Sequence, residues 1–161
     1  DVLTRIAAAV SPRPLALHIE DIADAAGYEG AFHISRSPDG FPAFSGGGCL
    51  SARDLARFGL LFARAGRDIS GKPFANSAFI VHSLSRDAAK LTPPKDWLQY
   101  SNHLMTDGRF VGHAGYGGQF LMVDTLSGTS CAFLSVLENE AGYDDAYMGL
   151  VAQTLRELCD Q

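Results

Sequence analysis

Cysteine is scarce in this chain, and its spacing excludes two kinds of structural cross-link. Among 161 residues there are three cysteines, Cys49, Cys131 and Cys159. An odd number of widely spaced cysteines with no C-x-x-C pair indicates neither a disulfide framework nor a zinc site. Because a free cysteine packs as a small hydrophobic residue, we expect buried free thiols and no metal site.

Basic runs and long apolar runs are missing as well. The chain has 13 Lys and Arg against 18 Asp and Glu, a net charge of −5. Without a basic stripe that could follow a phosphate backbone, nucleic acid is not an expected partner. No apolar run approaches the roughly 20 residues that span a bilayer, so we expect no membrane span. The 47% of hydrophobic residues is nevertheless enough to build a globular core.

Several enzyme motifs are absent, and each absence excludes a class. No serine lies in G-x-S-x-G, which excludes the nucleophile elbow of α/β-hydrolases. There is no H-E-x-x-H zinc motif and no G-x-x-x-x-G-K-[ST] phosphate loop. We therefore expect neither a metal nor a nucleotide, and no other cofactor is indicated.

Helical periodicity dominates the first half of the chain. Proline and glycine end the first two predicted helices, and Ser51 with Asp54 forms a capping-box pattern at the start of the third. Between the second and third, an irregular excursion is expected over residues 32–44. The predicted helices cover residues 2–10, 15–25, 52–65 and 77–84, and the first begins so close to Asp1 that we expect the natural N-terminus to lie upstream.

After Trp97 the pattern changes to that of strands, with turns at Asp107-Gly108 and Ser127-Gly128. Short links between strands predict antiparallel neighbours, and the last strand is apolar on both faces, which favours helices on both sides of it. A closing helix from Asp144 to Cys159 would bury Met148, Val151, Leu155 and Leu158. The predicted strands cover residues 98–106, 109–113, 120–124 and 130–137. The predicted class is α+β, with helical and connecting segments over residues 1–96 and strands plus the closing helix over residues 97–161.

The densest glycine cluster is Gly-His-Ala-Gly-Tyr-Gly-Gly-Gln at residues 112–119, between two predicted strands. Because glycine weakens a sheet, such a run marks a bulge or a place where a ligand lies against the backbone. The alternative is a tight glycine-rich hairpin in which His113 is only a packed residue.

Two stretches carry a resemblance to a known family. Residues 46–59, Gly-Gly-Gly-Cys-Leu-Ser-Ala-Arg-Asp-Leu-Ala-Arg-Phe-Gly, resemble the GG-x-x-x-[ST]-x-x-D-[LM]-A-R-[FL]-G stretch of class C-type β-lactamases and their relatives. These relatives include 6-aminohexanoate-dimer hydrolases, esterases of β-lactamase fold and D-amino-acid peptidases. Residues 113–119 resemble the third motif of the same superfamily of β-lactamases and penicillin-binding proteins, the K-T-G or H-x-G strand. The resemblance implies the C-terminal part of a β-lactamase-like fold.

The resemblance also implies chemistry. In this family the serine of a Ser-x-x-Lys motif attacks an ester or amide carbonyl, and an acyl-enzyme forms and is hydrolysed. Carried over by motif, Tyr116 would supply the second oxyanion N–H and His113 would project toward the pocket as a second catalytic-site residue. Ala114, Gly115 and Gly117 would line the substrate, a small-molecule amide or ester.

The departures from the family pattern limit what this chain does alone. No serine has lysine three positions later, and Ser70-Gly71-Lys72 is one residue too short. Tyr100-Ser101-Asn102 spells the family's second motif, Tyr-x-Asn, but follows residues 46–59 rather than preceding them, so we interpret it as a decoy.

Three functions remain open on the sequence. The chain is predicted to be the C-terminal part of a serine hydrolase, one incomplete domain that is inactive without the missing N-terminal part of the same protein. A non-catalytic binding homologue and a self-sufficient α+β binding domain are the alternatives.

Overall fold

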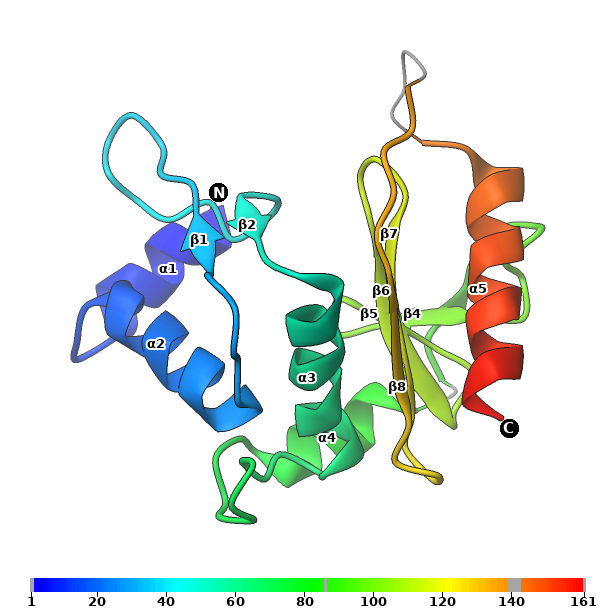
Figure 1. Ribbon diagram of the computed structural model, residues 1–161, viewed down its shortest axis with the longest axis horizontal. Helices are drawn as coiled ribbons and strands as arrows, with labels where there is room; N and C mark the ends of the chain where they lie inside the picture. The colour runs from blue at the N-terminus through cyan, green and yellow to red at the C-terminus, as the bar shows by residue number, and fades with distance from the viewer. Residues whose placement is uncertain (1, 86, 139–142, 161) are drawn as a thin grey trace.

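The computed structural model describes residues 2–85, 87–138 and 143–160, and it has the predicted α+β order of helices, antiparallel strands and a closing helix (Figure 1). The helices are α1 (Val2–Val10), α2 (Leu15–Ala26), α3 (Ala52–Ala63), α4 (Ser77–Ser83) and α5 (Asp145–Cys159). The strands are β1 (His33–Ile34), β2 (Gly48–Cys49), β3 (Ala89–Lys90), β4 (Gln99–Ser101), β5 (Leu104–Thr106), β6 (Phe110–Gly115), β7 (Gln119–Asp124) and β8 (Ser130–Phe133).

The main sheet is an antiparallel meander in the order β3-β4-β5-β6-β7-β8. Its two longest strands, β6 and β7, pair with Gly112 opposite Met122 and Gly115 opposite Gln119. A Cβ on Gly112 would lie 1.9 Å from the carbonyl oxygen of Leu121. Glycine is therefore required at the position that begins the glycine cluster.

The strand predicted over residues 98–106 is instead a hairpin of β4 and β5. Asn102 and His103 form its two-residue turn, with φ of +49° and +63°. Such a turn needs positive φ at both central residues, and asparagine tolerates that conformation better than most residues. The short strands β1, β2 and β3 were not predicted, and β1 lies within the excursion expected to be irregular over residues 32–44. The strand predicted to run to Leu137 ends at Phe133.

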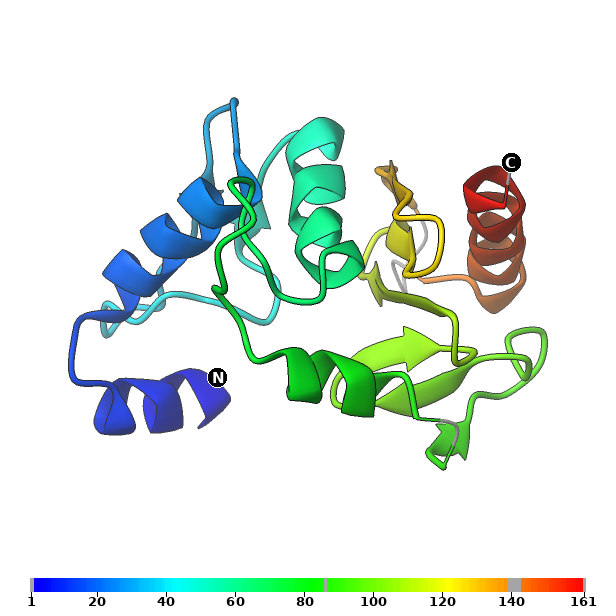
Figure 2. The same ribbon diagram turned by 90° about the horizontal axis from the view of Figure 1, so that it is seen from below.

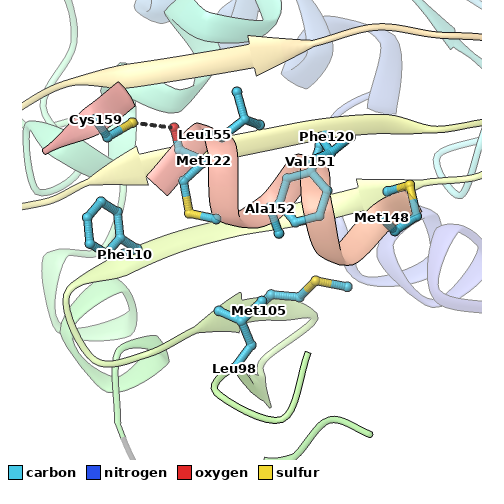
Figure 3. Packing of buried hydrophobic residues seen from close by; sticks show 10 residues of the cluster. All are labelled: Leu98, Met105, Phe110, Phe120, Met122, Met148, Val151, Ala152, Leu155 and Cys159. Carbon is cyan, nitrogen blue, oxygen red and sulfur yellow. Dashed lines mark hydrogen bonds between the residues drawn. The ribbon is translucent and has the colours of Figure 1, made fainter. Parts of the chain in front are cut away.

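Helices cover both faces of the sheet, as the apolar pattern of the last strand predicted. Figure 1 shows α3 and α5 on opposite sides of β6, β7 and β8. The side chains of β7 alternate between the two faces of the sheet. Phe120 and Met122 belong to the cluster under α5, whereas Leu121 and Val123 pack under α3. Figure 3 shows the cluster under α5.

Side chains cap the starts of three helices, and the capping pattern predicted at Ser51 is among them. Ser51 accepts a hydrogen bond from the Asp54 N–H at the start of α3, and Asn76 and Asp144 cap α4 and α5 in the same way. Gly27 ends α2 in the left-handed conformation. In Figure 2, α4 lies beside the β4–β5 hairpin, to which it is joined by hydrogen bonds from the Asn102 amide.

Two predictions of burial are wrong. Leu158 is 49% exposed, and the next residue, Cys159, occupies the core position instead. Cys49 lies at the exposed strand β2, so only Cys131 and Cys159 are at least partly buried free thiols. Among residues 2–85, 87–138 and 143–160, no helix combines the length and apolar character that a bilayer crossing requires.

Candidate active site

The last part of the glycine cluster, residues 116–118, forms the turn between β6 and β7, and the cluster's first four residues belong to β6. The Gly118 N–H donates to the Gly115 carbonyl at 3.3 Å, which closes the turn. Gly117 and Gly118 have φ of +85° and +94°, a region that favours glycine. The Tyr116 side chain is 75% exposed. Within the part of the chain that the structure describes, nothing accepts a hydrogen bond from the Tyr116 N–H.

The segment that follows β8 holds this turn from the side. Ser135 donates from its hydroxyl to the Gly118 carbonyl at 2.9 Å, and the Leu137 N–H donates to the Gly117 carbonyl at 2.9 Å. The Gln119 side-chain amide donates to the Ser135 carbonyl at 2.9 Å. The turn is thus bonded to a second segment at both glycines, which fixes the direction of its remaining N–H groups.

Both sequence stretches singled out above line one cleft. Gly46 and Gly48 approach it from the segment before α3, and Gly115 and Tyr116 approach it from the β6–β7 turn. The cleft has a volume of about 640 Å³ and is closed on one side by the segment that includes Leu134. This volume lies in the range of pockets that take small organic molecules.

A second cavity, of about 580 Å³, adjoins the first through Phe44 and Ser45, which line both. His113 on β6 and Tyr100 on β4 both line this cavity. Their side chains form a hydrogen bond, with 3.0 Å between Tyr100 Oη and His113 Nε2. His113 Nδ1 lies 2.6 Å from the Ala114 carbonyl. A carbonyl only accepts, so Nδ1 is the donor of that bond, and the Tyr100 hydroxyl can donate to Nε2.

Asp54 anchors the start of α3 beside the glycine run. Its carboxylate is 1% exposed and accepts from the N–H groups of Glu29 at 3.0 Å and Gly30 at 3.1 Å. Ser51 and Arg57 also donate to it, each at 2.8 Å. These hydrogen bonds, the one from Glu29 foremost, lower the pKa of Asp54 to about 2. The predicted capping residue is thus also a buried anion that ties the loop after α2 to α3.

The structure separates the predicted site residues into two groups. Gly115 and Tyr116 line the larger cleft, and His113 lines the adjoining cavity. Gly117 lies within the turn. The Ala114 side chain packs against the cluster under α5. The contact of Ala114 with His113 is made by the Ala114 backbone carbonyl.

Sequence reasoning missed the contribution of Tyr100. Its place in a hairpin that folds back toward His113 follows from the Asn102-His103 turn, which the strand pattern concealed. The described residues contain no cluster of three or more His, Cys, Asp or Glu side chains that could bind a metal ion.

The α+β fold, with an antiparallel sheet and a closing helix, is the one implied by the resemblance to the superfamily of serine β-lactamases and penicillin-binding proteins. A comparison with family models agrees, because the Beta-lactamase model matches residues 17–155. This chain belongs to the Beta-lactamase family. No match to it was found among curated proteins.

Proposed function

We propose that this chain is the C-terminal portion of a serine hydrolase that cleaves an amide or ester bond of a small molecule through an acyl-enzyme. The observation that carries the proposal is the shared cleft, where Gly46 and Gly48 face Gly115 and Tyr116. The Ser-x-x-Lys motif, which is absent from residues 1–161, would come from the N-terminal part of the same protein.

In the proposed reaction, the serine hydroxyl attacks the substrate carbonyl carbon, and its proton passes through lysine and tyrosine of the N-terminal part to the leaving amine or alcohol. Water then attacks the acyl-enzyme, which releases the acid and restores the serine. The Tyr116 N–H would stabilise the oxyanion in both steps, because Tyr116 lines the cleft and no described group accepts a hydrogen bond from this N–H.

His113 would act in the adjoining cavity, which it lines together with Tyr100. Its Nε2 is hydrogen-bonded to the Tyr100 hydroxyl, and this pair supplies a polar group that can orient a substrate. The backbones of Ala114, Gly115 and Gly117 would lie along the substrate, since the β6–β7 turn has no side chain larger than methyl at these positions.

Two surfaces are suited to the missing N-terminal part. Strand β8 ends the sheet order, and no described strand pairs with its outer edge. Beyond it, Leu134 and Val136 are exposed, and α1 exposes Val2 and Val10. An unpaired strand edge with apolar residues is a site where another strand or helix packs.

The role of the Tyr116 N–H can be tested by removing that group alone. Tyr116 is the second residue of the turn closed by the Gly118 N–H, a position that favours proline. In the full-length natural polypeptide we expect Tyr116→Pro to lower kcat for a p-nitrophenyl ester by about 10²–10³-fold. Tyr116→Ala keeps the N–H and is the matched control, for which most of the rate should remain.

Equal kcat values for the proline and alanine variants, with both folded, would contradict the proposed oxyanion contact. If the wild-type full-length polypeptide hydrolyses no ester or amide and reacts with no serine-directed probe, the binding homologue without a nucleophile is the better account of the fold.

A further inference from the structure

Two of the three cysteines meet at the base of the sheet, away from the cleft. Cys131 lies on β8 opposite Met122, and Cys159 is the last residue of α5. Their sulfur atoms are 3.1 Å apart, although the residues are 28 positions apart in the chain. Cys159 is 2% exposed and Cys131 is half-buried. Figure 3 shows Cys159 directed toward the backbone of Met122, to whose carbonyl its thiol donates at 3.7 Å.

The position of this pair in the fold permits a covalent bond. A disulfide requires a sulfur–sulfur distance of about 2.05 Å, so the two sulfur atoms would have to approach by about 1 Å. Cys159 ends its helix, and the last turn of a helix adjusts more readily than its middle. The strand that carries Cys131 is held on one side by β7, so the helix end would make most of the movement.

We propose that Cys131 and Cys159 form a reversible disulfide site that links the edge strand β8 to the end of α5, with a small disulfide such as oxidised glutathione as the oxidant. The Cys131 thiolate attacks one sulfur of the oxidant, which forms a mixed disulfide and releases one reduced glutathione. The Cys159 thiolate then displaces the second glutathione. Both cysteines are oxidised, and the two electrons and two protons leave with two molecules of reduced glutathione.

The order of the two steps follows from exposure. Cys131 is the more accessible thiol, whereas burial, with a contribution from Cys131 itself, raises the pKa of Cys159 to about 12. A thiol of high pKa is slow to attack a dissolved disulfide. It reacts in the second step because the mixed disulfide at Cys131 is held next to it.

The bond would connect strand β8, which leads into the segment along the cleft, to the last residue of α5. The segment that continues from β8 carries Ser135 and Leu137, which hold the Gly117–Gly118 turn. Closing a loop of about 30 residues restricts the unfolded chain, so we expect the oxidised form to have a Tm about 5–10 °C above the reduced form. The inference does not depend on the proposed hydrolase activity.

Peptide mapping tests the bond directly. Trypsin cleaves after Arg109 and Arg156, which places Cys131 and Cys159 on separate peptides, residues 110–156 and 157–161. We expect the full chain, incubated with oxidised glutathione and quenched with an alkylating agent at low pH, to yield these two peptides joined, with two hydrogen atoms fewer than their sum. Exposed Cys49 should carry a glutathione adduct and serves as the internal control for oxidation.

Two variants separate the pair from other thiol reactions. Cys49→Ser should still give the joined peptide and the higher Tm, and Cys131→Ser should give neither. The proposal is overturned if Cys49 is fully modified while Cys131 and Cys159 are still alkylated as free thiols after denaturation. A stable glutathione adduct on Cys131 with no joined peptide overturns it equally.

Discussion

Replacing Gly118 by alanine should destabilise the fold more than the same change at Gly117, although the two glycines are adjacent and both have positive φ. Alanine at either position incurs backbone strain of about 1–2 kcal/mol. At Gly117 the nearest atom to a new Cβ is the side-chain nitrogen of Gln119, at 3.2 Å. At Gly118 it is the Ser135 hydroxyl, at 2.3 Å, followed by Leu137 and Tyr147 at 3.3 Å.

The difference between the two variants can be estimated from these contacts. To admit the Cβ, Ser135 must move and lose its hydrogen bond to the Gly118 carbonyl, a loss of about 1 kcal/mol. Overpacking against Leu137 and Tyr147 adds about 1 kcal/mol or more. We therefore expect Gly117→Ala to lower the free energy of unfolding by about 1–2 kcal/mol and Gly118→Ala by about 3–4 kcal/mol.

Urea denaturation followed by circular dichroism measures both values. The double variant Gly118→Ala/Ser135→Ala removes the hydroxyl that collides with the new Cβ. Its loss of stability should be smaller than the sum of the single losses by about 1 kcal/mol, because both single variants lose the same hydrogen bond. Equal losses for Gly117→Ala and Gly118→Ala, or strict additivity in the double variant, would refute this account of the turn.

Three further predictions concern the framework of the cleft. Because the folded-state pKa of Asp54 is about 2, below its ordinary 3.8, the stability from its hydrogen bonds is present above pH 4 and lost as the pH falls toward 2. In thermal unfolding experiments, the Tm of the wild type should therefore fall more steeply between pH 5 and pH 2 than the Tm of Asp54→Asn. Gly112→Ala should cost at least about 3 kcal/mol, since its Cβ meets backbone, whereas Gly46→Ala, with nothing within 4 Å, should stay within about 0.5 kcal/mol. Asp124 is fully buried and accepts hydrogen bonds from Arg109 at 2.5 and 3.0 Å. Asp124→Ala should therefore lower the free energy of unfolding, measured by urea titration, by about 3 kcal/mol. A loss under about 1 kcal/mol would show that this ion pair is not needed for stability.

The sequence predicted those elements whose apolar pattern is strong. The helices over residues 2–10 and 52–63 and the strands around β6 and β7 follow from periodicity and from glycine or serine at their ends. The β4–β5 hairpin was missed because Asn102-His103 lacks the glycine that usually marks such a turn. Leu158 was predicted in the core position that Cys159 occupies. Adjacent residues at a helix end differ by about 100° around the axis, and the apolar pattern alone does not resolve which of the two is buried.

The glycine cluster and the run at residues 46–48 could be recognised in the sequence, but their meeting at one cleft could not. That meeting depends on α3 packing against the sheet, where a Cβ on Gly59 would lie 2.2 Å from Ser130. The bond between Tyr100 and His113, and the contact between Cys131 and Cys159, join residues far apart in the chain. Such contacts follow from tertiary packing, which local pattern does not encode.

Covalent labelling of the full-length natural polypeptide with a fluorophosphonate probe, followed by peptide mapping, tests the central claim most directly. The account predicts that the label is found on a serine upstream of Asp1, in a Ser-x-x-Lys motif, and on none of the serines within residues 1–161. Labelling of a serine within this chain, or no labelling of the folded full-length polypeptide, would contradict the proposal that this cleft belongs to a serine hydrolase completed by its N-terminal part.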